Sequence, residues 1–126
     1  MMIRYPVFVR ENDSGDMTAY SSVSGMMAYL EQIDVENGEY EAWDAAATRL
    51  KLSIQGSPWL VLDEIPGAGR PEELSAAITD YARRAGVFVD QTLLQKAQFA
   101  VALEKVDAAL KERRRSGSWW KKLFGK

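Results

Sequence analysis

Apolar and polar residues alternate along several short stretches in the first half of the chain. Residues 5–10 are rich in β-branched and aromatic side chains, a polar turn follows at 11–16, and residues 17–21 can return as a second strand. Residues 49–54 alternate strictly, with apolar side chains at the even positions, which is typical of a half-buried antiparallel strand. The apolar residues 59–62 predict a central, well-buried strand.

Asn37-Gly38 is the strongest turn signal in the sequence, because it stands between two alternating runs. An Asn-Gly pair in that setting favours a two-residue hairpin turn. In the resulting register four carboxylates share one face of the hairpin, and these are Asp34, Glu36, Glu39 and Glu41. Like charges directly opposite each other destabilise a pair of strands by up to about 1 kcal/mol. A sequence that keeps two such pairs either tolerates this cost or uses the site.

Apolar residues spaced by three and four positions predict three helices. A short helix over residues 23–30 follows the first two strands. A second helix starts at Pro71, with acidic residues in its first turn, and ends near Gly86. Asp90 is expected to cap the last helix, whose apolar stripe runs over residues 99–110.

Strands come first in the chain and most of the helices come last, an order typical of an α+β fold. We expect an antiparallel β-sheet of about five strands, a short helix after the first hairpin, and two C-terminal helices packed on one face of the sheet. Residues 66–70 are expected to form the loop between the sheet and the first of these two helices. The expected core contains Leu50, Leu52, Ile54, Trp59, Val61, Ile78, Phe99, Leu103 and Val106.

The length of 126 residues is that of a single domain. We divide the chain into one α+β domain at 1–112 and a basic, tryptophan-rich tail at 113–126. A Ser-Gly-Ser break at residues 116–118 is expected to interrupt the last helix inside this tail.

The chain contains no cysteine and no histidine. This composition excludes disulfides, thiolate nucleophiles, Ser–His–Asp catalysis and metal sites built on either residue. Catalysis would need carboxylates, a lysine or a tyrosine with a pKa shifted by a specific pocket. We therefore expect no enzymatic activity, no cofactor and no metal. We see no secretory signal in the first ten residues and expect a cytoplasmic protein.

Charge is divided sharply along the chain. Residues 1–80 contain fourteen acidic and five basic residues, a net charge of −9, and residues 81–126 contain four acidic and eleven basic residues, a net charge of +7. The overall charge of −2 therefore hides two regions of opposite sign. We expect the acidic region to bind another protein with a basic surface, whereas nucleic acid is disfavoured because most of the domain is acidic.

The acidic hairpin has two interpretations. As a solvated edge, it resists pairing with strands of other chains. As a docking surface for a basic partner, it gains contact area from its aromatic residues. The candidate partner-binding residues are Asp34, Glu36, Glu39, Tyr40, Glu41 and Trp43. A calcium site is a weaker third interpretation, since the ligand spacing of an EF-hand loop is missing.

The basic tail also has several interpretations. Its aromatic residues can fold back over one end of the domain, bind an anionic membrane surface, or dock on another protein. The candidate residues of this tail are Arg113, Arg114, Arg115, Trp119, Trp120, Lys121, Lys122 and Phe124. If the tail is an anchor, we expect the protein to lie at the inner face of the membrane.

These observations lead to one main functional hypothesis and one alternative. The main hypothesis is a small non-catalytic binding protein of bacterial type, such as an immunity protein or inhibitor that masks a basic toxin or effector with an acidic, aromatic surface. The alternative is a peripheral membrane-associated adaptor that is held by its basic, tryptophan-rich tail.

Overall fold

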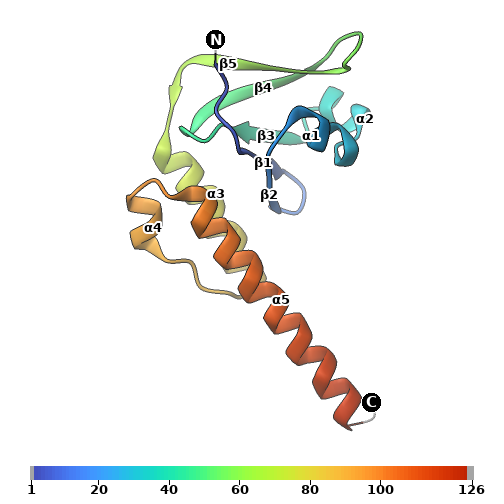
Figure 1. Ribbon diagram of the computed structural model, residues 1–126, viewed down its shortest axis with the longest axis vertical. Helices are drawn as coiled ribbons and strands as arrows, with labels where there is room; N and C mark the ends of the chain where they lie inside the picture. The colour runs from blue at the N-terminus through green and yellow to red at the C-terminus, as the bar shows by residue number, and fades with distance from the viewer. Residues whose placement is uncertain (1, 125–126) are drawn as a thin grey trace.

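The computed structural model describes residues 2–124, and it describes their side chains except for Ala68 and residues 114–124. Within this part of the chain, five strands and five helices are present (Figure 1). The strands are β1 (Val7–Glu11), β2 (Met17–Tyr20), β3 (Tyr40–Trp43), β4 (Thr48–Ile54) and β5 (Leu60–Gly69). The helices are α1 (Val23–Tyr29), α2 (Gln32–Glu36), α3 (Pro71–Ala85), α4 (Gln91–Gln95) and α5 (Phe99–Phe124).

The five strands form one antiparallel sheet in the order β2-β1-β3-β4-β5. Strand β1 pairs with β2 through a hairpin and with β3 on its other side, so α1 and α2 carry the chain past β1. This arrangement confirms the expected fold class, an antiparallel sheet with a short helical segment after the first hairpin and helices at the C-terminal end.

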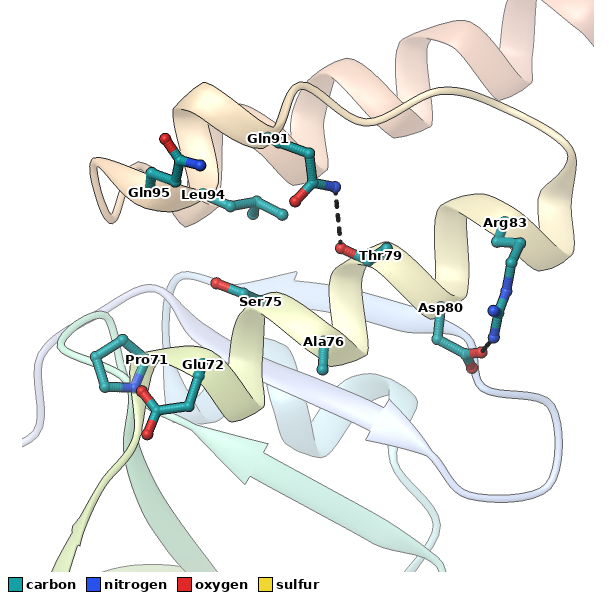
Figure 2. A pocket seen from close by; sticks show the side chains of 10 residues that line it. All are labelled: Pro71, Glu72, Ser75, Ala76, Thr79, Asp80, Arg83, Gln91, Leu94 and Gln95. Atoms are coloured by element: carbon teal, nitrogen blue, oxygen red, sulfur yellow. Dashed lines mark hydrogen bonds and ion pairs between the residues drawn. The ribbon is translucent and has the colours of Figure 1, made fainter.

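The expected ends of the C-terminal helices are present, but one helix is divided in two. Pro71 begins α3 and Gly86 ends it in the left-handed conformation, with φ of 72°. Asp90 caps a helix by accepting a hydrogen bond from the backbone N–H of Thr92, as expected. That helix is the short α4, and a left-handed Ala97 separates it from α5. Figure 2 shows α4 lying beside α3.

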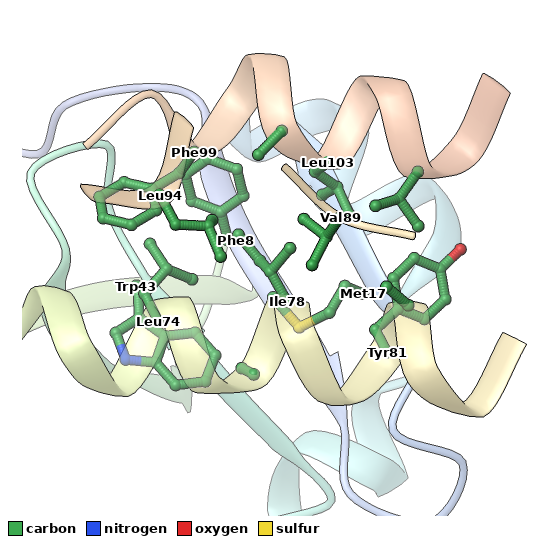
Figure 3. Packing of buried hydrophobic residues seen from close by; sticks show 14 of the residues in the cluster. Phe8, Met17, Trp43, Leu74, Ile78, Tyr81, Val89, Leu94, Phe99 and Leu103 are labelled. Atoms are coloured by element: carbon green, nitrogen blue, oxygen red, sulfur yellow. The ribbon is translucent and has the colours of Figure 1, made fainter. Parts of the chain in front are cut away.

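The core occupies both faces of the sheet. On one face, α3, α4 and α5 cover the strands, and Phe8 and Trp43 of the sheet pack with Leu74, Ile78 and Leu103 of the helices (Figure 3). On the other face, α1 and α2 cover a second cluster, which contains Val7, Val9, Met26, Val35, Ala42, Leu50 and Leu62. The sheet therefore separates two apolar clusters, and every strand residue belongs to one face or the other by alternation.

The predicted hairpin at Asn37-Gly38 was wrong. The residues before it form α2 rather than a strand, and Gly38 follows the helix in the left-handed conformation, with φ of 68°. The N–H of Gly38 donates to the carbonyl of Val35, and the N–H of Glu39 donates to the carbonyl of Asp34. These two hydrogen bonds form a Schellman motif, which satisfies the last carbonyl groups of a helix. The same Asn-Gly pair that suits a hairpin also suits a helix end.

The predictions for β4 and β5 were partly correct. Leu50 is buried and Lys51 is exposed, so the predicted alternation of β4 is confirmed. Ile78, Phe99, Leu103 and Val106 are also buried, whereas Leu52, Ile54, Trp59 and Val61 are only half-buried. Val61 belongs to β5, which is an edge strand rather than a central one, and Leu52 and Ile54 of β4 pair with β5 at this edge of the sheet. The predicted loop at 66–70 was also wrong up to Gly69, because β5 continues through it.

The predicted break at residues 116–118 was wrong as well, since α5 continues to Phe124. One glycine inside a helix costs only about 1 kcal/mol relative to alanine, which does not by itself end a helix. Figure 1 shows the C-terminal half of α5 extending away from the sheet and the other helices.

Candidate functional site

The clearest concentration of polar side chains lies where the β1–β2 turn meets the junction between α2 and β3. The register between β1 and β3 pairs Glu11 with Tyr40 and so brings the two segments together. Two hydrogen bonds from Asn12 fix this contact, one from its N–H to the carbonyl of Glu39 (2.9 Å) and one from its side-chain amide to the carbonyl of Gly38 (3.1 Å).

A small pocket of about 130 Å³ opens at this junction. Its lining contains four carboxylates and two hydroxyls, from Glu11, Asp13, Ser14, Asp34, Glu39 and Tyr40. We call this feature the acidic pocket. Its volume corresponds to about four water molecules, which is room for one side-chain head group rather than for a substrate.

The β1–β2 turn holds its part of the acidic pocket in a fixed shape. The hydroxyl of Ser14 donates to Glu11 Oε2 (3.2 Å) and accepts from the N–H of Asp16 (3.1 Å). Gly15 has φ of 77° and lies against Arg84, whose Nη1 donates to the carbonyl of Ser14 (3.1 Å). A side chain at position 15 would be strained in this conformation and would also press on Arg84, so only glycine suits the turn.

Tyr40 forms the inner wall of the acidic pocket. Its hydroxyl donates to Asp34 Oδ2 (3.4 Å) and lies 3.5 Å from the N–H of Glu31. Burial raises the pKa of Tyr40, and the nearby carboxylates of Asp34 and Glu11 raise it further, against a lowering by the Glu31 N–H. The phenol therefore stays protonated at neutral pH and remains a hydrogen-bond donor in an electronegative setting.

The sequence segment that supplies the acidic pocket is strongly one-sided in charge, although Arg84 of α3 reaches the Ser14 carbonyl at its edge. Residues 11–48 contain nine carboxylates and no lysine or arginine. Two of the nine are held by partners outside the pocket: Asp44 is buried and accepts from the N–H groups of Ala46 and Thr48, and Glu41 pairs with Arg49. The others lie in the pocket or at exposed positions near it in the sequence.

Exposed apolar side chains accompany these carboxylates. Tyr29, at the end of α1, is 77% exposed, and Ile33 of α2 is 60% exposed. The ring of Tyr29 lies 6.3 Å from that of Tyr20, and Tyr20 is close enough to Glu11 for this carboxylate to raise its pKa, although burial is the larger cause. We call the acidic pocket together with Tyr29, Ile33 and Glu36 the acidic surface.

The structure brings together some of the predicted partner-binding residues and separates others. Asp34, Glu39 and Tyr40 line the acidic pocket, and Glu36 is exposed on α2. Glu41 does not line the acidic pocket, because it alternates with Tyr40 along β3 and pairs with Arg49 instead. Trp43 was also assigned wrongly, since it is fully buried and offers no area to a partner.

Glu41 belongs to an ion-pair cluster between the sheet and α3. Arg49 Nη1 lies 2.9 Å from Glu41 Oε2 and also pairs with Glu73 of α3. The guanidinium carbon of Arg49 lies 5.2 Å from the centre of the Trp43 ring, at cation–π distance. We call Arg49, Glu41 and Glu73 the Arg49 clamp, and its role is to hold α3 against β3 and β4.

Sequence reasoning missed five residues of the acidic surface, namely Glu11, Asp13, Ser14, Tyr29 and Ile33. The segment 11–16 was interpreted only as a turn, and Ile33 was expected in the apolar face of a hairpin. The signal that places Glu11 beside Tyr40 is the pairing of β1 with β3, which depends on contacts between distant parts of the chain.

The basic tail is described only in part. Arg113 Nη1 donates to the carbonyls of Ala85 (3.0 Å) and Gly86 (2.8 Å) at the end of α3. The backbone of α5 runs through the remaining candidate residues, but their side chains lie outside the described part: Arg114, Arg115, Trp119, Trp120, Lys121, Lys122 and Phe124.

A larger groove of about 630 Å³ lies between α3 and α4. Figure 2 shows Gln91 and Thr79 facing each other across it, 3.4 Å apart, and Asp80 paired with Arg83. Its lining is mostly of small and uncharged polar side chains, such as Ser75 and Ala76. This groove contains no concentration of like charge comparable to that of the acidic pocket.

Three further observations concern the described residues. The acidic side chains among them include no group of three or more placed to hold a metal ion. None of the helices in this part of the chain is both long and apolar enough to cross a membrane. Comparisons of the chain with protein-family models, with curated proteins and with solved structures give no match.

Proposed function

We propose that this protein is a non-catalytic binding protein that uses its acidic surface to cover a basic site on another protein. The observation that carries the proposal is the convergence of Glu11, Asp13, Asp34 and Glu39 on one pocket, in a stretch of 38 residues without a basic side chain. A lysine or arginine head group is the chemical complement of such a pocket.

The surroundings of the pocket support a protein partner rather than a free cation. Tyr29 and Ile33 are exposed. Ile33 is next to Asp34 in α2, and the ring of Tyr29 lies 6.3 Å from that of Tyr20. Aromatic and aliphatic anchors near charge are typical of protein interfaces. The pocket itself is fixed by strand pairing and by the hydrogen bonds of Asn12 and Ser14. A rigid site loses little conformational entropy on binding.

The partner class follows from this chemistry. An acidic surface can block the cationic cleft of an enzyme that acts on nucleic acid or on lipid headgroups, since such clefts are lined by lysine and arginine. An immunity protein or inhibitor that neutralises a basic toxin or effector is the concrete form that we propose.

The test begins with affinity capture of the partner from the native host by the intact protein. The purified partner is then titrated against the wild type, the double variant Glu11→Gln/Glu39→Gln, and the control Glu104→Gln, which removes an exposed carboxylate from α5. We expect the double variant to lose at least tenfold in affinity, on the order of 1 kcal/mol for each carboxylate, and the control to lose less than twofold. Equal affinity of all three proteins would contradict the proposal.

A further inference from the structure

Phe88 is the most exposed large apolar side chain in the described part of the chain, at 94%. It lies in the loop between α3 and α4, and its neighbours hold that loop in place. Val89 is buried in the core under α5, and Val87 packs against the same cluster. The N–H of Val87 also donates to the carbonyl of Ala82 (2.9 Å). Phe88 is therefore held outward by two anchored residues.

Two arginines lie at the end of α3, where this loop begins. Arg83 and Arg84, in the last turn of α3, have side chains that are 78% and 50% exposed. Both pair with Asp80, at 2.7 and 2.8 Å, and Arg10 lies 3.7 Å from the same carboxylate. One carboxylate thus serves three guanidinium groups, which leaves a local excess of positive charge.

Arg113 adds to this excess. Its hydrogen bonds join it to the carbonyls of Ala85 and Gly86, which have no net charge, so the guanidinium retains its full charge beside the loop. Asp90, two residues after Phe88, accepts from the N–H of Thr92 at the start of α4. We call Phe88 with Arg83, Arg84 and Arg113 the basic tip.

The helix α5 continues past Arg113 to Phe124 and leaves the rest of the molecule there (Figure 1). Residues 111–124 contain six lysines and arginines and one glutamate. They also include two tryptophans, a leucine and a phenylalanine. The sequence at this end of α5 therefore resembles the basic tip in composition, since both combine cationic residues with large apolar ones.

We propose that the basic tip is a contact site for the surface of an anionic phospholipid membrane, with Phe88 inserted at the boundary between headgroups and acyl chains. Arginines attract the anionic headgroups, and an exposed ring that is held outward enters the boundary without rearrangement of the protein. A nucleic acid fits less well. Arg84 also donates to the carbonyl of Ser14 in the acidic pocket, so an extended polyanion would meet carboxylates directly beside the tip. A bilayer also offers an apolar boundary region for the exposed ring of Phe88, which a nucleic-acid duplex does not.

The test is sedimentation of the protein with two kinds of vesicle. One kind contains phosphatidylcholine alone, and the other contains phosphatidylcholine with one third phosphatidylserine. We expect binding to the anionic vesicles only, and we expect it to weaken with salt. Phe88→Ala should lower the partition coefficient about tenfold, because the variant has no phenylalanine ring to bury in the bilayer. Arg83→Gln should lower it about fivefold.

The matched control is Tyr29→Ala, which removes another exposed ring, 77% accessible, from the acidic surface and should leave vesicle binding unchanged. Both aromatic residues are exposed, so thermal melts of the two variants should match the wild type. Three results would overturn the proposal: no binding to anionic vesicles, equal binding by Phe88→Ala and the wild type, or binding of an oligonucleotide in place of vesicles. None of these results bears on the acidic surface, which is tested with a different partner.

Discussion

Replacing Arg49 with alanine is the sharpest test of how the structure divides the carboxylates into structural and exposed groups. The side chain of Arg49 is 25% exposed, and the carboxylates of Glu41 and Glu73 are 31% and 32% exposed. At this exposure water screens part of the attraction, so each ion pair contributes about 0.5–1 kcal/mol. The contact with Trp43 adds about 0.5–1 kcal/mol.

Arg49→Ala should therefore destabilise the protein by about 2 kcal/mol, and Glu41→Gln by about 0.5–1 kcal/mol. For a domain of this size, about 1 kcal/mol corresponds to about 3–5 °C in Tm, so Arg49→Ala should melt about 6–10 °C below the wild type. Urea denaturation with unchanged m-values would give the free energies of unfolding directly.

The control for this series is Lys105→Ala, which removes an exposed cation from α5 and should change stability by less than about 0.5 kcal/mol. Glu36→Gln, on the acidic surface, should be equally harmless. If Arg49→Ala were no more destabilising than Lys105→Ala, the Arg49 clamp would contribute nothing and Glu41 would belong with the exposed carboxylates.

Three further predictions concern single residues. A hydrogen bond from Arg83 is the main cause that lowers the pKa of the Asp80 carboxyl. The stability that the ionised carboxylate contributes is therefore present above its unfolded-state pKa, and it is lost as the pH falls through the lower folded-state pKa. Asp80→Asn should therefore be less stable than the wild type in urea at pH 7, and the difference should shrink below about pH 4. Gly38→Ala should cost about 1–2 kcal/mol because of its positive φ, whereas Gly56→Ala, with equal space around it, should be neutral in the same melts. Trp43→Phe should lower Tm but leave the affinity for a captured partner unchanged, because Trp43 is fully buried. A loss of affinity without a loss of stability would indicate that Trp43 contacts the partner.

Local sequence patterns were enough to predict much of the fold. Pro71, Gly86 and Asp90 define helix ends through their own backbone chemistry, and the predicted ends are confirmed. In β4, Leu50 is buried and Lys51 is exposed, and this alternation can be predicted from the sequence without knowledge of the partner strands.

The misplaced elements depended on information that local patterns lack. Asn37-Gly38 suits both a hairpin and a helix end, and the choice is made by packing, since Val35 of α2 is buried with Met26 and Leu50. Likewise, the apolar start of β5 indicates burial, but its place at the edge of the sheet depends on strand order.

The candidate site shows the same limit. The acidic character of the region was predictable from composition, because it needs only a count of charges. The set of residues that meet was not predictable, because Glu11 joins Glu39 only through the pairing of β1 with β3. The prediction that Glu41 shares an exposed face with Asp34, Glu36 and Glu39 rested on the hairpin at Asn37-Gly38, which the structure does not contain.

The most direct test of the central claim is the association rate constant with the captured basic partner, measured as a function of ionic strength. For the wild type, we expect a rate that falls steeply as salt is added, because exposed carboxylates steer a cationic partner over about a Debye length. The variant Glu11→Gln/Glu39→Gln should associate several-fold more slowly at low salt and depend less on salt, with unchanged stability. A salt dependence identical to that of the wild type would contradict the claim that the acidic surface is the binding site.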